Sequence, residues 1–345
     1  MRGSGEGLRD PAESDMAKCR GLANMREAVQ LASRCAHSNR SAMTSLNPSD
    51  QQERRRSLVL VFAAGLLWST VGLGIRLIED ANVWQILLYR SFGLTALLYI
   101  VIRWRTGVDP FRLVRRAGVA GVIAALSLVS AYSGAIYAMQ TTSVANAMLL
   151  FSTSPFMAAV LGWIVLREPV RIATWVAVVV ALGGIGVMFS DKSGAVSAAG
   201  SAGALVAALG FACFTVALRY GKSVEMMPSV FLSGIFAILI MGGICLVLGL
   251  PLILTPQDSG IALSMGVFQV GAGLVLFTMG SRSLPAAELA LLSLAEVILG
   301  PVWVWLFLGE TVGANTLIGG GILLVAIAGN ALSGIRRKPP PYFVR

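Results

Sequence analysis

The chain has 345 residues, of which 56% are hydrophobic and 13% are charged, and its mean hydropathy is +0.77. So apolar a composition cannot cover a water-facing surface, which excludes a soluble globular protein and predicts an integral membrane protein. The net charge of +10 does not indicate nucleic-acid binding, because the basic residues border apolar segments instead of alternating with aromatic ones.

The first 56 residues differ in kind from the rest of the chain. They mix basic and acidic residues with Ser, Gly and Asn, and they contain no apolar run long enough for a secretory signal. We therefore expect a disordered cytoplasmic tail over residues 1–56. Met43 is an alternative start, because MTSLNPSDQQERRRS would form a compact cytoplasmic lead-in, and N-terminal sequencing of the native protein would decide between the two.

Apolar runs of about 20 residues recur from residue 57 onward, the length that a helix needs to cross roughly 30 Å of hydrocarbon. We predict ten transmembrane helices, at 57–75, 83–102, 117–139, 143–166, 170–190, 200–220, 228–250, 260–281, 285–308 and 312–334. With the first helix starting inside, seventeen Lys and Arg residues lie on the inner side and only Arg76 and Lys192 on the outer side. This bias places both termini in the cytoplasm of a cell with a bacterial-type inner membrane, with residues 335–345 as a basic tail.

An internal repeat relates the two halves of the chain. The segment VLGWIVLREPVRIATWVAVVVALGGIGVMF at 160–189 aligns with VWVWLFLGETVGANTLIGGGILLVAIAGNA at 302–331, at a constant offset of 142 residues. We therefore predict two five-helix repeats, at 57–190 and 200–334. Because five is odd, the second repeat enters the membrane from the opposite side. Inverted-topology repeats are typical of secondary transporters, whose binding site lies near the midplane between the repeats.

The ending of each repeat carries a family signature. An apolar helix is followed by LREPV at 166–170 or LGETV at 308–312 and then by a Gly-rich helix, and the second span holds an arginine in LLYRSFGLTALL. The chain thus resembles the EamA-type members of the drug/metabolite transporter superfamily over about residues 57–334. This resemblance implies a ten-helix all-α fold, alternating access without ATP, and a cavity lined by helices 1 to 4 and 6 to 9. Helix 9 departs from the family's Glu-Pro pattern, since Val297 follows Glu296 and the proline comes at Pro301.

Three ionisable residues lie well inside predicted helices: Arg90, Glu288 and Glu296. Each costs at least a few kcal/mol at the bilayer centre unless it faces water or a partner. Glu296 lies about 16 Å into helix 9, near mid-bilayer. One interpretation is that Arg90 attracts an anionic substrate group while Glu296 binds a cationic group or a coupling proton. The alternative is that both tie helices together. Glu288 suits the N-terminus of helix 9.

Glu168 and Glu310 occupy equivalent repeat positions on opposite membrane faces. We interpret both as structural acids that anchor the tight turn into the next helix by accepting N–H bonds from its first turn, with a gating role as the alternative. The hinge candidates are Pro155 in helix 4 and Pro301 in helix 9, since proline interrupts the helical hydrogen bonds. Further candidates for the substrate site are Trp68, Tyr132, Ser154 and Gln269, each of which could instead serve packing alone.

Together these features predict a secondary transporter that moves a small metabolite, such as an amino acid, vitamin, nucleoside-like or drug-like compound, with coupling to protons through Glu296. The alternative is an intramembrane enzyme acting on lipid or isoprenoid substrates, but the chain has no Gly-x-Ser-x-Gly elbow. Without a phosphate loop, ATP drive is not supported. We expect no cofactor, metal or nucleic-acid partner. The partners are the substrate, the lipid bilayer and, through glycine-rich helix faces, a second copy in a homodimer.

Overall fold

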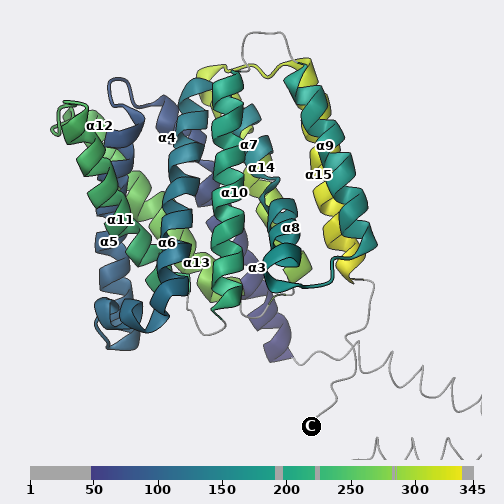
Figure 1. The fold of residues 1–345 in the computed structure, drawn as a ribbon, viewed down its shortest axis with the longest axis horizontal. Coiled ribbons are helices and arrows are strands. Elements are labelled where there is room, and N and C mark those ends of the chain that lie inside the picture. Colours follow the sequence, from purple (N-terminus) through teal and green to yellow (C-terminus); the bar gives the residue numbers. More distant parts are fainter. Residues whose placement is uncertain (1–47, 191–196, 222–225, 282–283, 285, 336–345) are drawn as a thin grey trace, which may run out of the picture. The chain divides into compact units, whose positions relative to one another are not determined.

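The computed structural model describes residues 48–190, 197–221, 226–281, 284 and 286–335, and every regular element in these ranges is helical (Figure 1). Met43, most of the expected N-terminal tail, and residues 336–345 of the basic tail lie outside them. The first described helix, α3 (Pro48–Ser69), already begins within the region expected to be tail, where Gln and Arg residues favour helix. Residues 1–56 form a separate unit, so the packing described below concerns the chain from Ser57 on.

Ten spans follow one another in the order that the sequence predicts. Nine of them are long and apolar enough to cross a membrane within the described residues, and the tenth is a shorter apolar segment at Leu294–Leu308. The chain is therefore a multi-pass membrane protein. The elements are α3 with α4 (Val71–Arg76), α5 (Val83–Thr106), α6 (Pro110–Thr141), α7 (Val144–Phe151) with α8 (Ser154–Leu166), α9 (Ile172–Phe189), α10 (Ala198–Tyr220), α11 (Met226–Val247), α12 (Pro256–Ser264) with η1 (Met265–Ala272) and α13 (Gly273–Gly280), α14 (Ala286–Leu308) and α15 (Ala314–Ile335).

The first and fourth spans are broken at a Ser-Thr pair. In the first span, Ser69 and Thr70 each donate their hydroxyl to the carbonyl three residues earlier, both at 2.7 Å. Ser152 and Thr153 do the same between α7 and α8, at 2.6 and 2.7 Å. Such side-chain bonds compete with the helical ladder and bend helices. At the second break Pro155 also lacks the N–H that would continue the ladder, so the break and the predicted hinge coincide.

The eighth span contains a wide π-helical turn. The span begins with α12, whose start is capped: the Thr255 hydroxyl accepts the N–H of Asp258 at 3.2 Å, and Pro256 occupies the first turn. The π-helix η1 follows over Met265–Ala272. Gly266 allows η1 to approach α5 closely, because a Cβ there would lie 2.0 Å from the carbonyl oxygen of Arg90. π-Helical turns are frequently found at functional sites.

The two repeats interlock instead of forming separate bundles. Helix α6 of the first repeat packs mainly against α10 of the second, α5 packs against α11, and α9 packs against α15. Figure 1 shows α9 and α15 side by side at one edge. Gly184 and Gly319 meet in this pair, since a Cβ on Gly319 would lie 2.4 Å from the Gly184 carbonyl oxygen. These two glycines therefore join the repeats, while a homodimer through other glycines stays a prediction.

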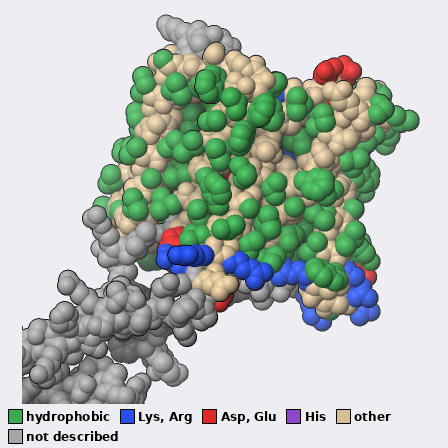
Figure 2. All heavy atoms as spheres, turned by 180° about the vertical axis from the view of Figure 1, so that it is seen from behind, with side chains coloured by type: hydrophobic (Ala, Val, Ile, Leu, Met, Phe, Trp, Pro, Cys, Tyr) green, Lys and Arg blue, Asp and Glu red, His purple; other side chains and the backbone are tan. Residues whose placement is uncertain are grey.

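The basic side chains on the visible face gather along its lower edge (Figure 2). Those at this end of the helices include Arg103 and Arg105 in the last turn of α5 and Arg219 in the last turn of α10. The opposite end of the helices carries Arg76. The charges are thus unevenly divided between the two ends, and the orientation that places the basic end in the cytoplasm stays a prediction.

Candidate functional site

A cavity of about 1000 Å³ lies between the two repeats. Both repeats contribute to its wall, through α3, α6, α7 and α8 from the first and α10, α11, η1, α13, α14 and α15 from the second. Five of the six predicted substrate-site residues line it: Trp68, Tyr132, Ser154, Gln269 and Glu296. Residues separated by more than 200 positions in the sequence are thus brought to one site, as expected for a cavity between repeats.

The cavity reaches only one end of the helices. Its lining includes Arg171, Met226, Glu288 and Asn330, which all lie at the end where α8 stops and α14 begins. We call this the Glu168 end, after the residue that follows α8. The opposite end, where α4 and α14 stop, is called the Glu310 end, and none of the residues that line the cavity comes from it. The described conformation is therefore closed at the Glu310 end.

Glu296 lines the cavity, and within the described part of the chain it forms neither an ion pair nor a hydrogen bond. It sits in the middle of α14, so its backbone groups are committed to the helix and only the carboxyl group is available. Gln269 in η1 lines the same cavity and is only 8% exposed. Its Nε2 lies 3.4 Å from the carbonyl oxygen of Trp68, while its Oε1 has no partner. Two acceptors are thus available in the cavity wall.

Arg90 does not line the cavity. It is 6% exposed in α5, with its guanidinium carbon 4.6 Å from the centroid of the Tyr132 ring. Tyr132 itself lines the cavity, so its ring lies between the arginine and the space that a substrate would enter. Arg90 and Glu296 form no ion pair in the described structure. The cation–π contact stabilises Arg90 inside the bundle, and its predicted role toward an anionic substrate group stays a prediction.

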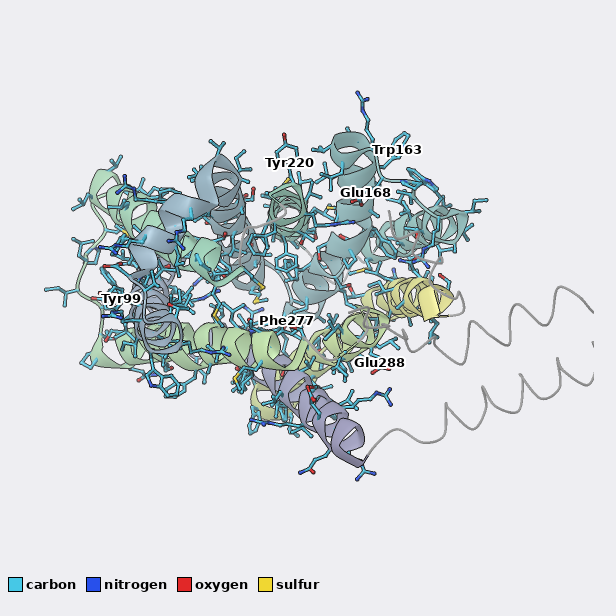
Figure 3. All side chains as sticks on the ribbon, turned by 90° about the horizontal axis from the view of Figure 1, so that it is seen from below. Tyr99, Trp163, Glu168, Tyr220, Phe277 and Glu288 are labelled. Carbon is cyan, nitrogen blue, oxygen red and sulfur yellow. The ribbon has the colours of Figure 1, made fainter. Side chains whose placement is uncertain are left out.

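Aromatic rings cover much of the cavity wall. Trp68 and Phe277 form a tilted pair with ring centroids 5.3 Å apart, and Phe211 contacts both Phe151 and Phe214 at 5.7 Å. In Figure 3 Phe277 lies toward the middle of the helices, whereas Trp163 lies at their periphery, where it is half exposed. The rings that line the cavity are Trp68, Phe151, Phe211, Phe214 and Phe277.

The two hinge candidates differ in their surroundings. Pro155 lies in the first turn of α8 and lines the cavity, directly after the break in the fourth span. Pro301 lies inside α14, which continues through it as one helix. Near it, the indole of Trp303 donates a hydrogen bond of 2.9 Å to the hydroxyl of Ser69 at the break in the first span. Whether either proline acts as a hinge stays a prediction.

Glu310 joins three elements at the Glu310 end. Its carboxylate accepts the Arg76 Nε–H and the Val144 N–H, both at 2.9 Å. The other side of the Arg76 guanidinium donates to the carbonyl oxygen of Thr142 at 2.9 Å. The expected N–H bond to a first helical turn is thus present, but that turn belongs to α7 of the first repeat and not to α15, the next helix. A carboxylate at a helix N-terminus is stabilised by the orphan N–H groups there.

Glu168 makes the repeat-related contact at the other end. The Arg219 guanidinium at the end of α10 donates to the Glu168 carboxylate. Arg76 ends the first span and Arg219 ends the sixth, and these spans correspond under the repeat. Each ion pair therefore joins an acid of one repeat to an arginine of the other, once at each end of the molecule. The sequence identified both acids, whereas the two arginines counted only toward the charge bias.

Asp258 is a buried acid that the sequence analysis did not single out. It is 1% exposed, and its carboxylate accepts the backbone N–H groups of Glu79, Asp80 and Ala81 at 3.1 to 3.2 Å. It thereby fixes the loop between the first two spans onto the start of the eighth, at the Glu310 end. The sequence signal that could have identified Asp258 is its position three residues after Thr255, because this spacing is typical of a capped helix start.

Interlocked repeats of opposite orientation around a central cavity define the chain as a membrane protein of transporter architecture. The sequence profile of the EamA-like transporter family matches residues 55–190 and again residues 198–332. The chain therefore belongs to the EamA-like transporter family, within the drug/metabolite transporter superfamily.

Proteins of known sequence and structure agree with this assignment. The chain is 28% identical over 194 residues to YwfM of Bacillus subtilis and 26% identical over 196 residues to a protein of Clostridium kluyveri, both named uncharacterized transporters. The matches cover 55% and 53% of this chain but only 65% and 62% of the relatives' lengths. A crystal structure with 18% sequence identity superposes with a TM-score of 0.59, covering 81% of this chain and 99% of the other, which supports the fold alone.

Proposed function

We propose that the protein is a secondary active transporter that moves a small metabolite across the bacterial inner membrane by alternating access. The observation that carries this proposal is the cavity between the repeats, in which the carboxyl group of Glu296 has no partner among the residues that the structure describes. A carboxyl group kept inside a membrane protein without a partner is costly, so a function must compensate for it. Binding of a substrate group or a proton supplies that compensation.

The two repeat-related ion pairs provide the closures that alternating access needs. In the described conformation Arg76 and Glu310 close the Glu310 end, and the cavity extends to the Glu168 end. The Arg219–Glu168 contact is already formed in the described conformation, at the end to which the cavity extends, so in the opposite conformation it would become more deeply buried as Arg76 and Glu310 separate. Because the two acids occupy equivalent repeat positions and the two arginines end corresponding spans, one rocking motion of the repeats would open one end while it closes the other. With the basic end in the cytoplasm, the described conformation faces inward.

Glu296 serves as the coupling group in this scheme. The other ionisable residues that line the cavity are Tyr132 behind the mouth and Arg171 and Glu288 at the mouth itself, and the buried Arg90 lies behind Tyr132. Glu296 is the one carboxyl group among them that lies mid-helix. A proton that binds there in one conformation and leaves in the other would couple the transmembrane proton gradient to the movement of substrate. The scaffold serves uptake or export according to the gradients.

The test uses purified full-length protein, first in a thermal-stability screen over amino acids, nucleosides, vitamins and cationic drugs, because ligand binding raises the unfolding temperature. The stabilising compound is then radiolabelled and its flux measured in liposomes with and without a pH gradient. We expect Glu296→Gln to abolish the response of flux to the pH gradient while the protein keeps its elution profile in detergent.

Glu79→Gln is the matched control, since it removes one carboxylate from an exposed loop outside the cavity. This variant should keep the wild-type response. Protein that binds a compound but moves none across the bilayer would overturn the transport proposal. Flux with unaltered pH dependence in Glu296→Gln would remove Glu296 from the coupling mechanism.

A further inference from the structure

The unused polar atoms in the cavity wall share one chemical character. The carboxylate of Glu296 and the Oε1 of Gln269 are both hydrogen-bond acceptors, and neither has a partner among the described residues. Gln269 directs its donor group elsewhere, toward the carbonyl oxygen of Trp68. The Gln269 oxygen is buried, and a buried acceptor without a donor is costly, so a ligand that restores its hydrogen bond must bring donors.

The cationic side chains near the cavity lie away from its centre. Arg171 is exposed at the mouth, at the start of α9, and Arg90 lies on the far side of the Tyr132 ring. No other Lys or Arg lines the cavity within the described residues. An anion entering the centre would therefore meet a carboxylate without a neighbouring cation, whereas a cation would neutralise that carboxylate. A desolvated charge pair of this kind is favourable when hydrogen bonds complete it.

The remaining wall consists of flat rings. Trp68, Phe277, Phe211 and Phe214 present faces or edges to the same space, and these rings attract cations and stack on other rings. A volume of about 1000 Å³ lies at the upper end of the range for small-molecule sites, which leaves room for a ring system beside the charged head. Small inorganic cations would leave most of this apolar wall uncovered.

We propose that the cavity takes an organic monocation, such as a protonated amine, attached to a flat aromatic body. The ammonium group binds the Glu296 carboxylate and the Gln269 oxygen, and the body lies between the aromatic rings around Trp68 and Phe277. This inference rests on the proposed transport function for its biological meaning, but it concerns the ligand class of the site and can be tested by binding alone.

Four small probes separate charge from shape. Tryptamine is a cation with an aromatic body, indoleacetate an anion with the same body, tryptophan a zwitterion, and methylamine a cation without a ring. Calorimetric titration of the purified full-length protein should show tryptamine binding at least about tenfold more tightly than indoleacetate and methylamine, because charge and ring both contribute. Equal or tighter binding of indoleacetate would overturn the proposal. Tighter binding of tryptophan would also overturn it, because the carboxylate of the probe would then contribute to binding.

Substitutions then assign the binding groups. Glu296→Gln keeps the shape of the side chain and should weaken tryptamine by about tenfold or more, while Glu79→Gln should leave its affinity unchanged. If Glu296→Gln fails to fold, Glu296→Asp keeps the charge and should retain part of the affinity. Phe277→Leu should weaken tryptamine but not methylamine. Unchanged tryptamine affinity in Glu296→Gln would overturn the assignment of the ammonium site.

The binding and flux measurements test the two proposals separately, so that either proposal can fail without the other. If tryptamine binds through Glu296 but no probe crosses liposomes that contain the protein, the ligand class stands and the transport proposal falls. If the liposomes transport an anion and the protein does not bind tryptamine, transport stands and the ligand class falls.

Discussion

The two ion pairs use acids at equivalent repeat positions and arginines at the ends of corresponding spans, but their environments are very different. At the Glu310 end, the side chains of Arg76 and Glu310 are 28% and 22% exposed, and each also bonds to a backbone group of the first repeat. At the Glu168 end, the side chains of Arg219 and Glu168 are 50% and 42% exposed. Sequence symmetry therefore does not imply energetic symmetry. The difference reports which end the described conformation closes, and each prediction below tests that difference.

The largest difference should appear when each acid is truncated. Glu310→Ala leaves the guanidinium of Arg76 and the N–H of Val144 without their acceptor in a half-buried site, which should cost about 2 to 4 kcal/mol of stability. Glu168→Ala removes an exposed pair and should cost about 0 to 1 kcal/mol. Thermal unfolding of both variants in the same detergent measures the difference. Equal losses would show that the two ends contribute alike and that neither is preferentially closed.

A smaller effect should remain after the charges at one end are exchanged. The double variant Arg76→Glu with Glu310→Arg restores an ion pair but leaves the Val144 N–H facing a donor and the Thr142 carbonyl oxygen facing an acceptor. We expect it to remain about 1 to 2 kcal/mol less stable than the wild type. The corresponding exchange of Arg219 and Glu168 should recover nearly all the stability, since no backbone partner is lost. Complete recovery at both ends would contradict the role assigned to the backbone bonds.

The sequence determined the architecture because its signals were repeated. Ten apolar runs, an odd number of spans per repeat and the offset between Glu168 and Glu310 together predicted ten helices in two inverted repeats, whereas the interlocking of the repeats became visible only in the structure. Each signal involves many residues or occurs twice, so a local exception does not obscure it. The Ser-Thr pairs that break the first and fourth spans were readable in principle, because Ser and Thr compete for helical carbonyl groups.

The geometry of the site was less accessible from sequence. Counting residues from the predicted helix ends placed Arg90 and Glu296 at similar depth, but only packing decides which of them lines the cavity, and Arg90 packs against the Tyr132 ring instead. Likewise, the π-helical turn that positions Gln269 depends on how closely α5 approaches Gly266. Partners such as Arg76 for Glu310 are 234 positions apart, and no local pattern links them. Long-range pairing is therefore the part that a single sequence does not specify.

The smallest effect concerns the balance between the two conformations. In a background without the native cysteines, Ala331→Cys lies in the cavity wall and Ala147→Cys is buried in α7 near the Glu310 end. A water-soluble thiol reagent should label the first cysteine readily and the second slowly. Adding Glu310→Ala removes the ion pair that holds the Glu310 end closed. In the conformation that is open at this end, the groups that lose their partner are hydrated. We therefore expect a shift of only about 1 kcal/mol, or about fivefold faster labelling of Cys at position 147.

Glu168→Ala supplies the control for this measurement, because it weakens the contact proposed to close the other end. It should leave labelling at position 147 unchanged or slightly slower, since the conformation open at the Glu310 end loses its own closure. Acceleration by both truncations would indicate general loosening of the helices, whereas opposite effects require two closures that compete. The sign of the change therefore distinguishes alternating access from simple destabilisation, even where its size is small.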